Sequence, residues 1–111
     1  MSHSTLVLLQ GTADILVLRA LSDGSPAHGY TVSQWVRART DGVLAIEDAA
    51  LYQTLHRLEA KGWIDGEWGL SENNRRAKYY SLTAAGRRQL RAGVATWKRY
   101  ADAMGKVIES A

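Results

Sequence analysis

EDAALYQTLHRLEAKGWIDGEWGLSENNRRAKYY, residues 47–80, carries a helical pattern followed by an alternating one. Leu51, Leu55 and Leu58 recur at helical spacing, which predicts an amphipathic helix over residues 48–62 with a narrow buried stripe. Acidic residues at its start suit the helix dipole and could cap its free amides, and a glycine at its end suits the left-handed position that closes many helices. The outer face of this helix is therefore left free for a partner.

The alternating part predicts a β-hairpin. One strand is expected over residues 63–70, with even-numbered residues such as Trp68 and Leu70 facing inward. A second strand is expected over residues 78–82, and the polar segment 71–76 between them has turn chemistry because Asn tolerates positive φ. The hairpin then presents a cluster of basic side chains: Arg75, Arg76 and Lys78.

Two further helices are predicted before this stretch. Residues 6–21 place apolar side chains at spacings of three and four, and Gly11 within them is attributed to close packing. A turn at His28 leads to a second helix over residues 31–40, and the apolar run 43–46 is expected to pair as a small strand or to pack as a connector. Three helices and a hairpin are the element order of a winged helix-turn-helix, so the predicted fold class is α+β and mostly helical.

The last element is predicted to be a long helix over residues 84–108, capped by Thr83. Its apolar residues recur at spacings of four and three: Leu90, Val94, Trp97, Ala101, Met104 and Ile108. Such a helix would extend roughly 37 Å, longer than the ~26 Å of a compact domain of about 100 residues. It needs a partner helix, which a second copy of the chain would supply. The chain is accordingly divided into a winged helix-turn-helix domain, residues 1–82, and a C-terminal dimerisation helix, residues 83–111.

Composition limits the functions open to the chain. It has 111 residues, 46% of them hydrophobic, and no cysteine, so disulfides, thiolate metal sites and cysteine nucleophiles are excluded. Three scattered histidines make a poor ligand set, and neither a metal nor a cofactor is expected. No apolar run approaches the ~20 residues of a membrane span and no export signal is evident, which predicts a cytoplasmic protein with no membrane partner.

Basic charge is concentrated late in the chain. Residues 1–70 hold 5 basic and 8 acidic side chains, whereas residues 71–100 hold 8 basic and 1 acidic. The net charge of +3 hides this asymmetry. A positive hairpin and helix start favour a nucleic-acid partner, although a solvated charged helix explains part of the pattern.

Four segments carry a resemblance to a known family: LLQGTADILVLRAL, HGY, ALYQTLHRLEAKGWI and NNRRAKYYSLTAAGRRQL. Together and in this order they resemble the PadR-type transcriptional regulators, bacterial winged-helix repressors, over nearly the whole chain. The chain is similar to the short branch of that family, which has a single C-terminal dimerisation helix. The resemblance implies a ligand-responsive homodimer on a palindromic DNA operator, usually one controlling its own gene or a neighbouring transporter or detoxification gene.

Two departures from the family pattern bear on DNA recognition. Glu47 and Asp48 stand where many members carry Ser followed by a small residue or Pro, and carboxylates there disfavour phosphate unless they face inward as caps. Gln53 replaces the proline usual after the Leu-Tyr pair, which adds a side chain able to read adenine bidentately. These departures bear on base preference rather than on the fold.

Several candidate DNA contacts lie on the predicted third helix. Tyr52 matches a family tyrosine whose hydroxyl touches the phosphate backbone, the alternative being a buried tyrosine with an internal hydrogen bond. Gln53 and Thr54 are expected to point outward in the N-terminal half, which usually meets base edges. Arg57 is expected to hold a phosphate or a base, and His56 to be solvated.

The hairpin supplies the remaining candidate DNA contacts. Arg75 and Arg76 carry guanidinium groups that fit phosphate bidentately and favour a narrow minor groove. Lys78 is expected to contact the DNA backbone.

Trp97 lies at the centre of the apolar stripe of the last helix. It is interpreted as dimer core, and the alternative is an aromatic pair that sandwiches a small hydrophobic effector, with Tyr100 and Met104 lining the same pocket. The remaining tryptophans are expected in the core or shielding it: Trp35, Trp63 and Trp68.

Three classes of function are weighed. The leading hypothesis is a sequence-specific DNA-binding regulator. The alternative is a winged-helix protein-interaction module, which steep salt dependence of DNA binding would argue against. Catalysis is not expected, because the sequence has no phosphate-binding glycine loop, paired catalytic carboxylates or nucleophile elbow.

Overall fold

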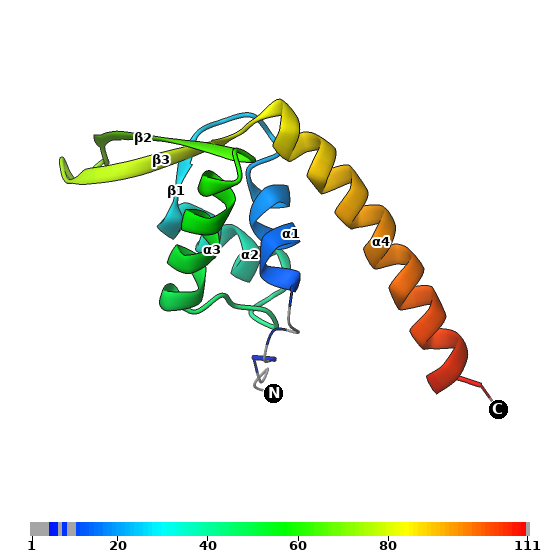
Figure 1. Ribbon diagram of the computed structural model, residues 1–111. Coiled ribbons are helices and arrows are strands. Elements are labelled where there is room, and N and C mark those ends of the chain that lie inside the picture. The colour runs from blue at the N-terminus through cyan, green and yellow to red at the C-terminus, as the bar shows by residue number, and fades with distance from the viewer. Residues whose placement is uncertain (1–4, 7, 9–10, 111) are drawn as a thin grey trace.

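The computed structural model describes residues 5–6, 8 and 11–110. Its elements follow one another as α1 (Thr12–Ala20), β1 (Ala27–His28), α2 (Gly29–Arg39), α3 (Asp48–Ala60), β2 (Ile64–Leu70), β3 (Arg76–Leu82) and α4 (Ala84–Ile108). In Figure 1, α1, α2 and α3 form a bundle, the β2–β3 hairpin projects beyond it on one side, and α4 leaves on the other. The predicted α+β, mostly helical winged helix-turn-helix fold is confirmed.

One apolar core holds the helices and the root of the sheet together. Its fully buried members come from α1, α2, α3, the α2–α3 connector and the start of β2: Val17, Leu21, Val32, Val36, Ile46, Leu51, Leu55, Leu58 and Ile64. Burying a side chain of this size contributes roughly 1.5–3 kcal/mol. The core therefore fixes α3 and the base of the hairpin relative to each other.

The sheet has three antiparallel strands in the order β1-β3-β2. The hairpin register pairs Ile64 with Leu82 at its root and Leu70 with Arg76 at its tip. β1 is an addition to the prediction: Ala27 and His28 pair with β3, while the His28 imidazole accepts a hydrogen bond from Thr31 N at 3.4 Å and caps α2. This cap starts α2 at Gly29, two residues before its predicted start.

α3 ends in a turn that leads the chain directly into β2. Gly62 adopts φ 77°, its amide donates to Glu59 O at 2.9 Å, and the Trp63 amide donates to Leu58 O at 3.1 Å. This is the pattern of a Schellman C-cap, which reverses the chain within two residues. At the other end Glu47 occupies the N-cap position but makes no side-chain capping bond.

α1 begins later than predicted. The expected helix over residues 6–21 starts only at Thr12, because Gly11 takes φ 86°, and residues 7, 9 and 10 lie outside the described residues. Close packing is not the reason for the glycine, since a Cβ there would meet nothing within 4 Å. The Leu6 amide instead donates to Val43 O at 2.8 Å, so the predicted 43–46 connector contributes a single bridge rather than a strand.

α4 has its predicted bounds. The Thr83 hydroxyl accepts from the Gly86 amide at 3.0 Å, which caps the helix. A Cβ on Gly86 would lie 2.0 Å from Trp63 O, so only glycine lets the first turn lie against the α3–β2 junction. None of the helices in the described part of the chain is long and apolar enough to cross a membrane.

Candidate nucleic-acid interface

The outer face of α3 is open to solvent. Tyr52, Gln53 and His56 are all exposed there, whereas Leu51, Leu55 and Leu58 are buried beneath them. Tyr52 is therefore not the buried, internally bonded tyrosine weighed as an alternative. Gln53, on the side of the helix away from the core, has an amide that could reach a partner without moving α3.

Thr54 does not point outward, and that prediction is wrong. Its side chain is only 3% exposed. Thr54 lies three residues after Leu51 and four before Leu58, so it extends their row along one side of the helix. α1 packs against α3 and widens the buried stripe beyond the three leucines. Thr54 is a core residue and cannot meet a base edge.

Arg57 is partly engaged within the chain. Its guanidinium donates to the Asp14 carboxylate of α1 in an ion pair, and its side chain remains 46% exposed. The pair ties the outer edge of α3 to α1. The exposed remainder of the guanidinium still has donors that an external phosphate could accept from.

The tip of the hairpin is a structured turn that leaves two arginines exposed. Ser71 N donates to Arg75 O at 2.8 Å and Asn74 takes φ 58°, as the turn chemistry of the asparagines predicts. Arg75 makes no side-chain hydrogen bond or ion pair with the residues that the structure describes, and Arg76 is also exposed. These two guanidinium groups are the ones the fold leaves available at the tip.

Lys78 is held against α3. Its ammonium donates to the Glu59 carboxylate at 2.8 Å, and this hydrogen bond raises the pKa of Lys78 above its ordinary value of 10.5. Gly66 makes the contact feasible, because a Cβ there would lie 2.5 Å from the Lys78 side chain. Burial raises the pKa of the neighbouring Tyr80 hydroxyl. Lys78 thus braces the hairpin on α3 in this structure, and its predicted contact to the DNA backbone stays a prediction.

The outer half of β2 does not face a core. Trp68 is 59% exposed and Leu70 is exposed too, although both were predicted to face inward with Ile64. The alternation itself is correct, but the hairpin extends past the helices (Figure 1), and the large side chains of β2 beyond Gly66 are left exposed on its inner face. Trp68 instead lies under the Arg76 guanidinium, whose carbon is 4.4 Å from the indole centroid.

α4 carries its apolar side chains in two zones. Leu90 packs against the core of its own chain rather than standing free for a partner, and Val94 is partly buried. Beyond them the predicted stripe is exposed together with its neighbours: Trp97, Tyr100, Ala101, Met104, Val107 and Ile108. A partner helix would therefore meet α4 over its second half.

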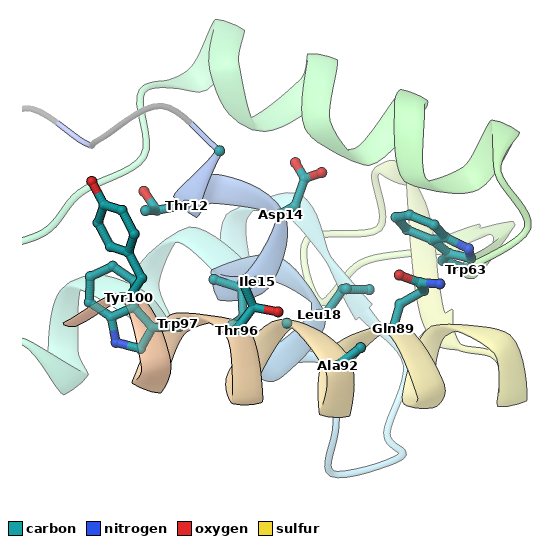
Figure 2. A pocket seen from close by; sticks show the side chains of 12 residues that line it. Thr12, Asp14, Ile15, Leu18, Trp63, Gln89, Ala92, Thr96, Trp97 and Tyr100 are labelled. Atoms are coloured by element: carbon teal, nitrogen blue, oxygen red, sulfur yellow. The ribbon is translucent and has the colours of Figure 1, made fainter. Parts of the chain in front are cut away.

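A groove of about 790 Å³ runs between α1 and α4. Figure 2 shows Ile15 and Leu18 on one wall, with Trp97 and Tyr100 at one end and Trp63 at the other. The rings of Trp97 and Tyr100 are 6.4 Å apart between centroids. Asp14, the partner of Arg57, also lines the groove, which connects this cavity to the outer edge of α3.

Three residues of the two surfaces were not singled out from the sequence as contacts: Asp14, Glu59 and Trp68. Asp14 and Arg57 are 43 positions apart, and no local pattern could pair them. The position of Glu59 could have been predicted from the sequence. It lies seven residues after Tyr52, which places it on the side of α3 next to the hairpin. The exposure of Trp68 could be predicted only by knowing where the sheet extends past the core.

A three-helix bundle with a short β1 strand, a projecting basic hairpin and a long terminal helix defines a winged helix-turn-helix protein. The chain belongs to the PadR-like family of transcriptional regulators, whose family model matches residues 17–92. Both α3 and the β2–β3 hairpin lie wholly within that matched part.

Solved structures agree with this assignment. A transcriptional regulator from Clostridium thermocellum is 27% identical, with a TM-score of 0.81 over 89% of this chain and 95% of that one. A PadR family transcriptional regulator from Eggerthella lenta is 34% identical, with a TM-score of 0.75 over 92% of this chain and 86% of that one. PadR from Bacillus subtilis, solved in complex with operator DNA, shares the fold at 18% identity, with a TM-score of 0.67 over 75% of this chain and 46% of that one.

Proposed function

We propose that this chain is a sequence-specific DNA-binding repressor that acts as a homodimer on a palindromic operator and responds to a small hydrophobic ligand. The observation that carries the proposal is the exposed outer face of α3 beside a hairpin whose tip displays Arg75 and Arg76. The family membership and the operator complex of the Bacillus subtilis relative support it.

α3 is the proposed reading helix. In a winged helix-turn-helix this element enters the major groove while the hairpin reaches the adjacent backbone or minor groove. Gln53 is the proposed base-reading residue and Tyr52 a phosphate contact, since both are exposed on α3. Arg75 and Arg76 contribute charge-assisted contacts to phosphate, which give affinity without sequence preference. Lys78 joins them only if its bond to Glu59 is exchanged for one to DNA.

The acidic start of α3 limits how DNA approaches. Glu47 and Asp48 are both exposed, and Glu47 is not turned inward by a capping bond. Carboxylates repel phosphate, so we expect the DNA backbone to pass away from this end. The approach then favours the middle of α3 and the hairpin.

The homodimer is proposed to form through the second half of α4. The exposed apolar residues there repeat at spacings that suit packing between two helices, and a two-fold axis pairs like with like. Two reading helices related by such an axis match a palindrome with half-sites about 34–36 Å apart, or a multiple of that distance. The proposed dimer therefore requires the proposed two-fold symmetry of the operator.

The α1–α4 groove is the proposed ligand site. Its walls are largely apolar and it offers the Trp97 and Tyr100 rings at one end. A ligand shifts the protein only if it binds one arrangement of α4 and α1 more tightly than another. Asp14 lines the groove and forms an ion pair with Arg57, so a shift of α1 would be transmitted through this pair to α3.

Nuclease footprinting over the region upstream of the protein's own gene tests the proposal. We expect a protected segment with two-fold related halves, and raised transcription of a reporter when the gene is removed. Protection spread evenly along the DNA would contradict sequence-specific binding. Protection of a site without two-fold symmetry would contradict the dimer geometry.

A further inference from the structure

An exposed indole sits among the cations of the hairpin. Trp68 is 59% exposed, the Arg76 guanidinium carbon lies 4.4 Å from its ring centroid, and Lys78 Nζ lies 5.9 Å from it. The strand register explains the arrangement, because Trp68 is paired with Lys78 and is the diagonal neighbour of Arg76. We call these three residues the wing stack.

The wing stack occupies the face of the hairpin that continues from the core. Side chains alternate along a strand, so Trp68 shares a face with Ile64, which is fully buried. Tyr80, on the same face of β3, is also buried, and Lys78 next to it bonds to Glu59 of α3. Because Lys78 bonds to Glu59, the stack lies on the side of the hairpin that faces α3, and Figure 1 shows that the hairpin projects from the bundle at an angle to α3. DNA in contact with both elements would fill that angle.

The opposite face of the hairpin carries bracing contacts of its own. The Tyr79 hydroxyl donates to Leu70 O at 3.1 Å, and a Cβ on Gly69 would lie 3.3 Å from the Tyr79 ring. The His28 ring meets the edge of Tyr79 at 5.3 Å between centroids. Tyr79 thus braces the two strands from the outside, while the Trp68 ring on the inner face remains largely exposed.

We infer that Trp68 is a positioning residue for Arg76 and itself a contact to the sugar-phosphate backbone of DNA. The inference rests on the proposed function. An arginine side chain loses rotamer freedom when it binds phosphate, and stacking on Trp68 restricts that freedom in advance. The flat indole is sequence-tolerant, because the sugar that it meets is present at every nucleotide. Trp68 therefore raises affinity for all duplexes equally and leaves sequence preference to α3.

The test measures binding to two duplexes, the upstream region of the protein's own gene and a scrambled version, for the intact chain, four single variants and one double variant. Trp68→Leu keeps apolar bulk but removes the ring, whereas Trp68→Tyr keeps a ring for stacking. Leu70→Ala is the control for lost apolar area, because Leu70 is exposed on the same face of the hairpin, lies opposite Arg76 and has no ring for a cation to stack on. Arg76→Ala completes the set and is combined with Trp68→Leu in a double variant. Circular dichroism checks that each variant is folded.

Loss of the ring in Trp68→Leu is expected to weaken binding to both duplexes about tenfold, as loss of a desolvated cation–π and stacking contact does. Trp68→Tyr restores most of the affinity, and Leu70→Ala stays within about twofold of the intact chain. Because Trp68 acts partly through Arg76, the double variant is expected to be weaker than Trp68→Leu by much less than Arg76→Ala alone costs.

Three results would overturn the inference. If Trp68→Leu binds both duplexes as well as the intact chain does, Trp68 does not contact DNA. If the losses of affinity of the two single variants multiply in the double variant, Trp68 does not position Arg76. Leu70→Ala as weak as Trp68→Leu would make the effect one of hairpin shape. The proposed function fails separately and earlier, if the intact chain binds its own upstream duplex no better than the scrambled one.

Discussion

The hairpin and the second half of α4 leave the core in different directions, and both expose large apolar side chains (Figure 1). In the hairpin, Trp68 is covered by the Arg76 guanidinium, and the tip is basic. In α4, Met104 and Ile108 continue an apolar series at heptad spacing, and the charged residues between its members carry both signs. Two exposed apolar surfaces of one small chain thus differ in what surrounds them.

The difference shows that the residues around an exposed apolar side chain indicate what kind of partner it binds. Cations beside an aromatic ring suit a polyanion, because charge supplies the attraction and the ring supplies a flat contact. An apolar stripe at heptad spacing suits an identical helix, because burial is its only source of stability. We therefore assign DNA to the hairpin and a second copy to α4, and each assignment can be broken separately.

Breaking the α4 surface is expected to have the largest effect. Met104→Glu places a charge in the proposed helix pair, and the chain should sediment at its own mass of 12.2 kDa rather than at twice that value. Binding to a palindromic duplex should fall by about 100-fold or more, because each half-site is then bound alone. Ala95→Glu adds the same charge on the opposite side of α4 and should leave the dimer intact. A Met104→Glu chain that remains dimeric would show that α4 pairs elsewhere.

Breaking the hairpin surface has the next largest effect. Arg76→Ala removes a guanidinium that we assign to phosphate, so binding to specific and scrambled duplexes should weaken together by about tenfold. The slope of log affinity against log salt should fall in magnitude by about one. Arg99→Ala on α4 removes the same charge far from the hairpin and is the control. Equal losses in the two variants would mean that net charge, not the hairpin, attracts DNA.

A variant of α3 sharpens the contrast between affinity and specificity. Gln53→Ala should lower the preference for the specific duplex by about 1–3 kcal/mol while binding to the scrambled duplex changes little. Thr54→Val is the matched control, because Thr54 is buried and should not affect base preference. Competition titrations with single-base variants of the operator provide the measurement. If base preference changed in Thr54→Val but not in Gln53→Ala, the assignment of Gln53 as the reading residue and Thr54 as a core residue would be contradicted.

The smallest expected effect concerns the joint between hairpin and α3. The pKa of Lys78 is raised by its bond to Glu59, and the pKa of Tyr80 is raised by burial, from ordinary values of 10.5 and 10.0. A raised pKa means that the folded chain favours the protonated form, so these contributions are present below about pH 10 and are lost as pH rises further. Urea unfolding between pH 8 and 11 should show this decline. Glu59→Gln should flatten the part due to Lys78, and an unchanged pH profile would count against the bond in solution.

The sequence carried the parts of the fold that local patterns specify. Thr83 as a cap, the length of α4 and the asparagine turn all follow from chemistry within a few residues, and the structure agrees with each. The start of α1 did not follow, because Gly11 with φ 86° cannot be told from a glycine inside a helix. β1 is only two residues long and has no period to detect.

The candidate site was predictable only in part, for a geometric reason. Tyr52 and Gln53 are exposed as expected, whereas Thr54 is buried because α1 covers one side of α3. Alternation correctly placed Trp68 on the inner face of the hairpin but could not say that this face extends past the core. Ion pairs such as Lys78 with Glu59 depend on how elements pack, which the spacing of residues along the chain does not give.

The central claim is that the chain reads a DNA sequence, and a fluorescence-anisotropy titration at two salt concentrations tests it most directly. The intact protein is titrated into a labelled duplex from the upstream region of its own gene and into a scrambled duplex of the same length. We predict binding to the first about 10³-fold or more tighter than to the second, with a steep loss of affinity as salt rises. Equal affinity for both duplexes, or no binding at low salt, would contradict the claim.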